Sequence, residues 1–126
     1  MKKLFIATFM LVSSFGTNVM ADGHAIKMGI ILGFTGPIES LTPAMAGSAE
    51  LAFKEASDSG SLLGGKKIEV IRADSTCVDS AAATAAAEGV ISQGVAAIMG
   101  ADCSGVTGAI ASVSYTHLTL PTKRIV

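Results

Sequence analysis

The sequence is poor in aromatic residues and in positive charge. It has 126 residues with no tryptophan, one tyrosine and five phenylalanines, and between residues 22 and 114 only Phe34 and Phe53 are aromatic. Across that span, five basic residues minus ten acidic residues give a net charge of −5. Nucleic acids and anionic membranes are bound by basic patches, in nucleic-acid binders often with interleaved aromatics. The composition therefore excludes both as expected partners.

Histidines are scarce too, and the sequence patterns of metal and nucleotide sites are missing. The two histidines, His24 and His117, lie near the start of the expected mature chain and near its end, so no metal site is predicted. The stretch 33–36 lacks the G-x-G-x-x-G spacing of a dinucleotide site. The stretch 60–67 begins like a phosphate loop, but Lys67 stands where serine or threonine is needed. We therefore expect no cofactor.

The N-terminus lacks an apolar run long enough to cross a membrane. Lys2 and Lys3 precede an apolar run at 4–12, and polar residues interrupt the stretch that follows it. A membrane span needs about 20 apolar residues. A charged start, a short apolar core and a small residue at Ala21 are typical of a signal peptide that is cleaved after that alanine. No cysteine lies at the expected cut, so we predict an exported, soluble protein with residues 1–21 removed.

After this segment, strand-like and helix-like patterns alternate three times. Short apolar runs, typical of strands buried on both faces, predict strands at 26–33, 68–74 and 95–100. Apolar residues at helical spacing predict helices at 42–60, 80–93 and 104–114. The alternation predicts an α/β fold, a three-layer parallel sheet with right-handed crossovers and the strand order 2-1-3.

Polar residues at the expected helix starts are candidates for helix caps. Thr42 is followed by Pro43 at the first helix, Asp79 precedes the second, and Ser104 stands at the third. Threonine, aspartate and serine are favoured at the N-cap, and proline is favoured in the first turn. A plain capping role is therefore one open interpretation of Ser104.

The loops after the first and third strands carry a second interpretation of Ser104. In the order 2-1-3 the strand order reverses between these two strands, and open α/β sheets bind ligands at such a point. The stretches GFTGPIES (33–40) and GADCSG (100–105) would then face one crevice. A helix that starts at Ser104 exposes free N–H groups and a partial positive charge, which suit a carboxylate or a similar anion.

The two cysteines, Cys77 and Cys103, follow the second and third strands. Cys103 beside a helix N-terminus could be a reactive thiolate, but no histidine is placed to act as its base. In an exported protein two such cysteines favour a disulfide. The second and third strands should lie about 10 Å apart, whereas bridged Cα atoms lie roughly 4.4 to 6.8 Å apart. The two loops would therefore have to lean together above the first strand.

Four stretches resemble the periplasmic branched-chain amino acid binding proteins, the leucine/isoleucine/valine-binding family of ABC transporters. They are IKMGIILGFTGP (26–37), GSAELAFKEASDSG (47–60), ADSTCVDSAAATAAA (73–87) and GADCSGVTGAI (100–110). The resemblance runs from Ile26 to about Ser114. It implies part of the first lobe of a type I periplasmic binding protein fold, a periplasmic location and binding without catalysis.

The resemblance also implies roles for individual residues. In that family the paired cysteines form a disulfide, which matches Cys77 and Cys103. The serine after the second cysteine holds the α-carboxylate of the ligand through its hydroxyl and its backbone N–H, which matches Ser104. Where relatives often have a tyrosine near the ligand side chain, this chain has Leu41. The candidate substrate-binding residues are therefore Leu41, Asp102, Cys103, Ser104, Gly105 and Thr107.

The function implied by the resemblance is that of a monomeric substrate-binding component of an ABC importer. It would capture an amino acid, of the branched-chain type or related to it, and pass it to an ABC permease. Three alternatives stay open: binding of short amides or urea, the extracellular sensing domain of a receptor with the same fold, and a thiol-dependent enzyme that would need a free Cys103.

The last part of the sequence departs from these patterns. The stretch YTHLTLPTKRIV (115–126) has no helical face and resembles translated adapter sequence. We therefore expect residues 22–114 to form a truncated N-terminal lobe and residues 115–126 to be a non-native tail. A lobe truncated after three strands would be marginally folded, with an open edge on the third strand, and would bind ligand weakly.

Overall fold

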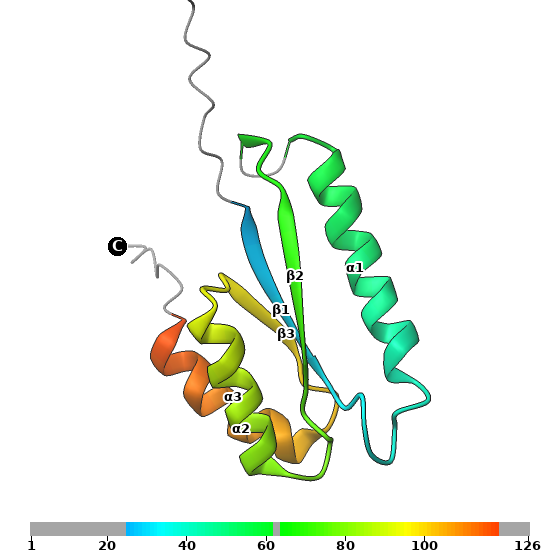
Figure 1. Ribbon diagram of the computed structural model, residues 1–126, viewed down its shortest axis with the longest axis vertical. Coiled ribbons are helices and arrows are strands. Elements are labelled where there is room, and N and C mark those ends of the chain that lie inside the picture. Colours follow the sequence, from blue (N-terminus) through cyan, green and yellow to red (C-terminus); the bar gives the residue numbers. More distant parts are fainter. Residues whose placement is uncertain (1–24, 62–63, 119–126) are drawn as a thin grey trace, which may run out of the picture.

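The computed structural model describes residues 25–61 and 64–118 (Figure 1). The expected signal peptide and its cleavage after Ala21 lie outside the described residues, as do residues 119–126. Within the described part of the chain, none of the helices is both long enough and apolar enough to span a membrane.

Strands and helices alternate along the chain, as the sequence predicts. They are β1 (Ile26–Leu32), α1 (Thr42–Asp58), β2 (Ile68–Asp74), α2 (Ser80–Ser92), β3 (Ala97–Gly100) and α3 (Ser104–His117). All pairings are parallel and the strand order is β2-β1-β3. Helix α1 lies on one side of the sheet, and α2 and α3 lie together on the other (Figure 1). This confirms the predicted three-layer α/β fold and its strand order.

The central strand β1 supplies both halves of the core. Ile30, Ile31 and Leu32 are at most 1% exposed, because β1 is covered on both faces and paired on both edges. Ile31 packs in a cluster with α2 and α3, whose buried residues are Ala83, Ala87, Val90, Val106 and Ile110. Ile30 and Leu32 pack on the other face with Ala46 of α1, and Ala49 and Phe53 of the same helix pack against this cluster. Each face of β1 is therefore covered by its own set of helices.

The predicted N-cap residue is confirmed for α2 but not for α1. Asp79 is the N-cap of α2, and its Oδ1 accepts the N–H groups of Ala81 and Ala82 at 2.8 and 3.0 Å. The predicted cap of α1 is wrong, because Thr42 is already helical and Leu41 occupies the N-cap. The buried Thr42 hydroxyl instead donates to the Gly33 carbonyl at 3.1 Å, which fastens α1 to the end of β1.

Element ends also differ from the predicted ranges. Helix α3 continues to His117, past the point at which its apolar pattern stops, and Tyr115 on this last turn is 83% exposed. Strand β3 starts at Ala97, although Val95 before it is buried in the core. At the other end of β3, Gly100 has a φ of +139°, and a Cβ there would lie 2.0 Å from the Ile31 carbonyl oxygen. Only glycine allows β3 to end this close to β1.

Candidate functional site

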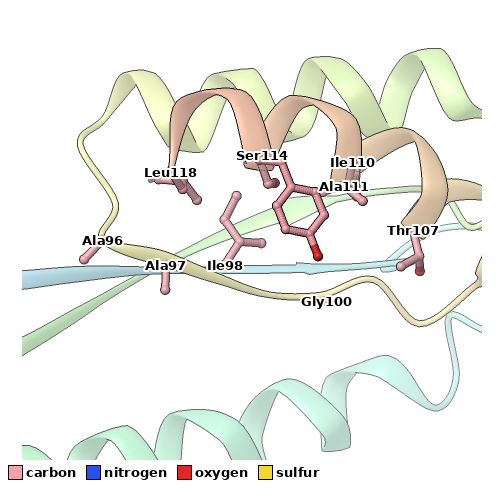
Figure 2. A pocket seen from close by; sticks show the side chains of 10 residues that line it. Ala96, Ala97, Ile98, Gly100, Thr107, Ile110, Ala111, Ser114 and Leu118 are labelled. Atoms are coloured by element: carbon pink, nitrogen blue, oxygen red, sulfur yellow. The ribbon is translucent and has the colours of Figure 1, made fainter. Parts of the chain in front are cut away.

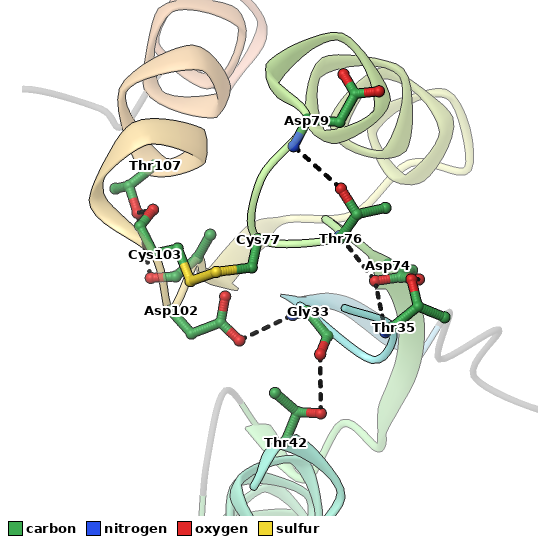
Figure 3. The surroundings of a disulfide bond; sticks show 11 residues. Gly33, Thr35, Thr42, Asp74, Thr76, Cys77, Asp79, Asp102, Cys103 and Thr107 are labelled. Carbon is green, nitrogen blue, oxygen red and sulfur yellow. Dashed lines mark hydrogen bonds between the residues drawn. A yellow bond between two sulfur atoms is a disulfide. The ribbon is translucent and has the colours of Figure 1, made fainter. Parts of the chain in front are cut away.

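The three loops that follow β1, β2 and β3 (residues 33–41, 75–79 and 101–103) meet at the carboxyl-terminal end of the sheet, which we call the loop edge (Figure 3). A disulfide joins Cys77 in the β2–α2 loop to Cys103 in the β3–α3 loop, with the Cα atoms 5.3 Å apart. This confirms the predicted pairing. Both cysteines of the chain are used, so the alternative of a thiol-dependent enzyme with a free Cys103 is wrong.

Gly33 explains how the disulfide crosses the end of β1. It is buried, and a Cβ on Gly33 would lie 3.1 Å from the Cys77 Cβ and 3.3 Å from the Cys77 nitrogen. The two loops do lean together over the first strand, as the expected strand spacing requires. The missing side chain at Gly33 makes room for Cys77, a role that no local pattern in the sequence indicates.

The start of α3 is left uncapped by the disulfide. Cys103 is the N-cap, so the predicted capping role of Ser104 is wrong, and Cys103 makes no side-chain cap because its sulfur is bonded to Cys77. The first backbone bond of the helix runs from the Thr107 N–H to the Cys103 carbonyl at 2.9 Å. The N–H groups of Ser104 and Gly105 thus have no acceptor within the helix. Both residues are exposed.

The side chains of the other candidate residues, Thr107, Leu41 and Asp102, differ in their contacts and exposure. The Thr107 hydroxyl donates to the Cys103 carbonyl at 2.8 Å and to the Ala101 carbonyl at 3.3 Å, so it serves the loop backbone. Leu41 is 61% exposed just before α1. Asp102 does not face solvent freely, because its Oδ2 accepts the Gly33 N–H at 2.8 Å and its Oδ1 is buried.

A second carboxylate, that of Asp74 at the end of β2, joins two of the loops. Its Oδ2 accepts the Thr35 hydroxyl at 2.5 Å, and its Oδ1 accepts the N–H groups of Thr35 and Thr76 at 3.3 and 2.8 Å. Burial raises the pKa of Asp74, but these hydrogen bonds outweigh burial and hold the pKa below the ordinary value of an aspartate. The bond to Thr76, two residues on, is an Asx turn that the motif Asp74-Ser75-Thr76 could have suggested.

A hollow on the described residues lies away from this loop edge. It measures about 660 Å³ and lies between the outer edge of β3 and α3, where Ile98, Ile110 and Ala111 line it (Figure 2). Of the predicted binding residues only Thr107 reaches it. The hollow is mostly apolar, whereas the loop edge presents free N–H donors at the start of α3. The loop edge would cover a bound molecule from one side only, so no enclosed cavity is expected there.

Metal binding finds no support in the described parts of the chain, residues 25–61 and 64–118. No three side chains of the His, Cys, Asp and Glu types gather there closely enough to hold an ion. Asp74 and Asp102 are each engaged with backbone or threonine donors of neighbouring loops.

The fold is an α/β lobe with a three-stranded parallel sheet, and the start of α3 lies uncapped at the loop edge. Comparison with protein families agrees: the family model described as periplasmic binding protein matches residues 25–118. The chain belongs to this family of non-enzymatic binding proteins. No curated protein sequence is similar enough to count as a match.

Solved structures support the fold. The chain is similar to a protein assigned as a branched-chain amino acid ABC transporter from Rhodospirillum rubrum (22% identity, TM-score 0.64). It is similar to a leucine binding protein from Thermotoga maritima (24%, 0.57). It is also similar to the branched-chain amino acid transporter substrate binding protein LivJ from Streptococcus pneumoniae, in complex with isoleucine (28%, 0.53). Each match covers 74% of this chain and, in this order, 27, 25 and 26% of the other, so the chain spans about a quarter of their length.

Proposed function

We propose that this chain forms part of the substrate-binding component of an ABC importer and captures an amino acid, of the branched-chain type or related to it, in the periplasm. The observation that carries the proposal is the uncapped start of α3 at the disulfide. In α2 the carboxylate of Asp79 accepts two N–H groups, whereas in α3 no side chain caps the first N–H groups, because the N-cap residue Cys103 is bonded to Cys77.

The α-carboxylate of the ligand is the group that fits this helix start. The N–H groups of Ser104 and Gly105, together with the Ser104 hydroxyl, can donate to its two oxygens. The partial positive charge at a helix N-terminus favours an anion there. A hydrogen bond to a charged group contributes about 1.5 to 3 kcal/mol. The isoleucine-bound relative is 28% identical to this chain, which supports an amino acid as the ligand.

The charges of the loop edge favour a zwitterion over a simple carboxylate. Asp74, Asp79 and Asp102 all lie at this edge, and Arg72, two residues before Asp74, is paired with Glu50. Negative charges near the helix start disfavour a lone anion and favour a ligand that also carries an ammonium group. Leu41, exposed beside α1, offers an apolar contact to an aliphatic ligand side chain.

The remaining parts of this function lie beyond the described residues. We infer a second lobe that closes over the ligand, because one loop edge supplies a single wall and the matched structures are about four times longer than the matched part. Export through a signal peptide at residues 1–21, a monomeric state and delivery to an ABC permease belong to the same proposal.

A neutral amide or urea is the second candidate ligand class. The free N–H groups of Ser104 and Gly105 can donate to a neutral carbonyl as well as to a carboxylate. A neutral carbonyl gains less from the helix dipole, so an amino acid should bind more tightly than acetamide or urea.

The test is a titration of the 126-residue chain with L-isoleucine, acetamide and urea, repeated on Ser104→Ala and on Ser112→Ala. Ser112 lies on the exposed face of the same helix and donates to the Ala109 carbonyl, so it is a matched control. We expect isoleucine to bind best, and Ser104→Ala to weaken it about tenfold or more while Ser112→Ala leaves it unchanged. Equal affinity in all three proteins would contradict the assignment of Ser104.

A further inference from the structure

We propose that Asp102 is a positioning residue for the ligand site rather than a contact to the ligand. Its carboxylate fixes the distance between the β1–α1 loop and the β3–α3 loop. It thereby orients the N–H groups of Ser104 and Gly105 toward the ligand. This inference rests on the proposed function, because it concerns the same helix start.

The position of Asp102 follows from the register of the sheet. The last paired residues of β1 and β3 are Ile31 and Gly100. Gly33 and Asp102 each lie two residues further along, so they face each other where the backbone pairing has already ended. There the Asp102 Oδ2 accepts the Gly33 N–H at 2.8 Å. The side chain thus replaces the backbone acceptor that a longer β3 would have supplied, and it extends the β1–β3 connection into the loops (Figure 3).

Gly33, the partner of Asp102, is held from several directions. Its carbonyl accepts the Thr42 hydroxyl at 3.1 Å, and a Cβ added to it would lie 3.1 Å from the Cys77 Cβ. Gly33 is therefore a fixed point between α1 and the disulfide. The bond from Asp102 ties the loop that leads into α3 to this fixed point. The backbone pairing of β1 with β3 ends at Gly100, and the bond from Asp102 adds a hydrogen bond between the loop beyond it and Gly33.

The second carboxylate oxygen of Asp102 argues against direct contact with a ligand. Oδ1 is buried and has no hydrogen-bond partner among the described residues. A ligand could reach it only if the loop moved, and such a movement would break the bond to Gly33. Because a buried carboxylate oxygen is costly, Asp102 must contribute something that a neutral apolar residue cannot. The acceptor for the Gly33 N–H is that contribution.

The experiment compares three variants of the full 126-residue chain: Asp102→Ala, Asp102→Asn and Val90→Ala. Asparagine keeps an oxygen that can accept the Gly33 N–H, whereas alanine does not. Val90 is buried in α2 within the core and is not part of the loop edge, so Val90→Ala is a control for lost stability alone. Amide hydrogen exchange at Gly33 and the amide chemical shifts of Ser104 and Gly105 are measured by NMR before and during titration with L-isoleucine.

We expect Asp102→Ala to raise the exchange rate at Gly33 at least tenfold over Val90→Ala at matched global stability. It should also shift the Ser104 and Gly105 resonances and weaken isoleucine binding at least threefold, and Asp102→Asn should restore all three. Unchanged Ser104 and Gly105 resonances in Asp102→Ala, or exchange at Gly33 equal to the control, would overturn the positioning role. Absence of isoleucine binding by the unmodified chain would count against the proposed function only, because the exchange and shift measurements need no ligand.

Discussion

Gly33 and Cys77 lie so close that a Cβ on Gly33 would stand 3.1 Å from the Cys77 Cβ. This contact lets the disulfide cross the end of the central strand, and it brings the β2–α2 and β3–α3 loops together over β1. The uncapped start of α3 follows from the same arrangement, because the sulfur that could approach its N–H groups is bonded elsewhere.

Gly33→Ala should destabilise the fold by about 1 to 3 kcal/mol, the cost of overpacking a tight site. Cys77 cannot easily move away, since it is held by the disulfide and has a φ of +69°. Gly47→Ala is the control, because a Cβ at Gly47 meets nothing within 4 Å, and alanine in a helix should stabilise by roughly 0.5 to 1 kcal/mol. Urea unfolding of both variants checks this. Equal stability of Gly33→Ala and the unmodified chain would show that the β2–α2 loop can move to accommodate the added methyl group.

Reduction of the Cys77–Cys103 disulfide should lower the free energy of unfolding by about 3 to 4 kcal/mol, because the bond closes a loop of 26 residues in the unfolded chain. Urea unfolding with and without reductant measures this difference. Mass spectrometry of non-reduced, alkylated protein should find no labelled cysteine. Labelling of both thiols would contradict the arrangement at the start of α3.

Asp74→Asn should destabilise the protein at neutral pH by about 1 kcal/mol, through weaker hydrogen bonds to Thr35 and Thr76. The pKa of Asp74 is lowered in the folded protein, so its carboxylate stabilises the fold above the unfolded pKa of about 4, and this contribution is lost as the pH falls through the folded pKa. The difference between the two proteins should therefore be constant near pH 7 and shrink below pH 4. A difference that grows on acidification would contradict this account of Asp74.

Much of the fold could be predicted because it depends on patterns that are local in sequence. Apolar runs and helical spacing gave the alternation of strands and helices, and the Asp79 cap followed from the residues beside it. The caps at Thr42 and Ser104 were misplaced by one residue. In both cases a partner distant in the sequence determines where the helix begins. The Thr42 hydroxyl donates to the Gly33 carbonyl at the end of β1, and Cys103 is bonded to Cys77.

The arrangement within the site could be predicted only in part. The disulfide and the free helix start at Ser104 follow from residue types and from the resemblance. The bond between Gly33 and Asp102 depends on the register of β1 against β3, which the sequence does not display. The same holds for the bonds of Asp74 to Thr35, which join loops far apart in the chain. The sequence therefore predicts Asp102 as a candidate ligand contact, whereas in the structure its carboxylate accepts the Gly33 N–H.

The central claim is that the free N–H groups at the start of α3 bind the carboxylate of an amino acid. Titration of the isotopically labelled 126-residue chain with L-isoleucine, followed by amide NMR, tests it directly. We predict that the Ser104 and Gly105 resonances shift most and that the dissociation constant is on the order of 1 mM or weaker, because a single wall offers few contacts. Shifts confined to the hollow beside β3, or micromolar binding, would contradict the account.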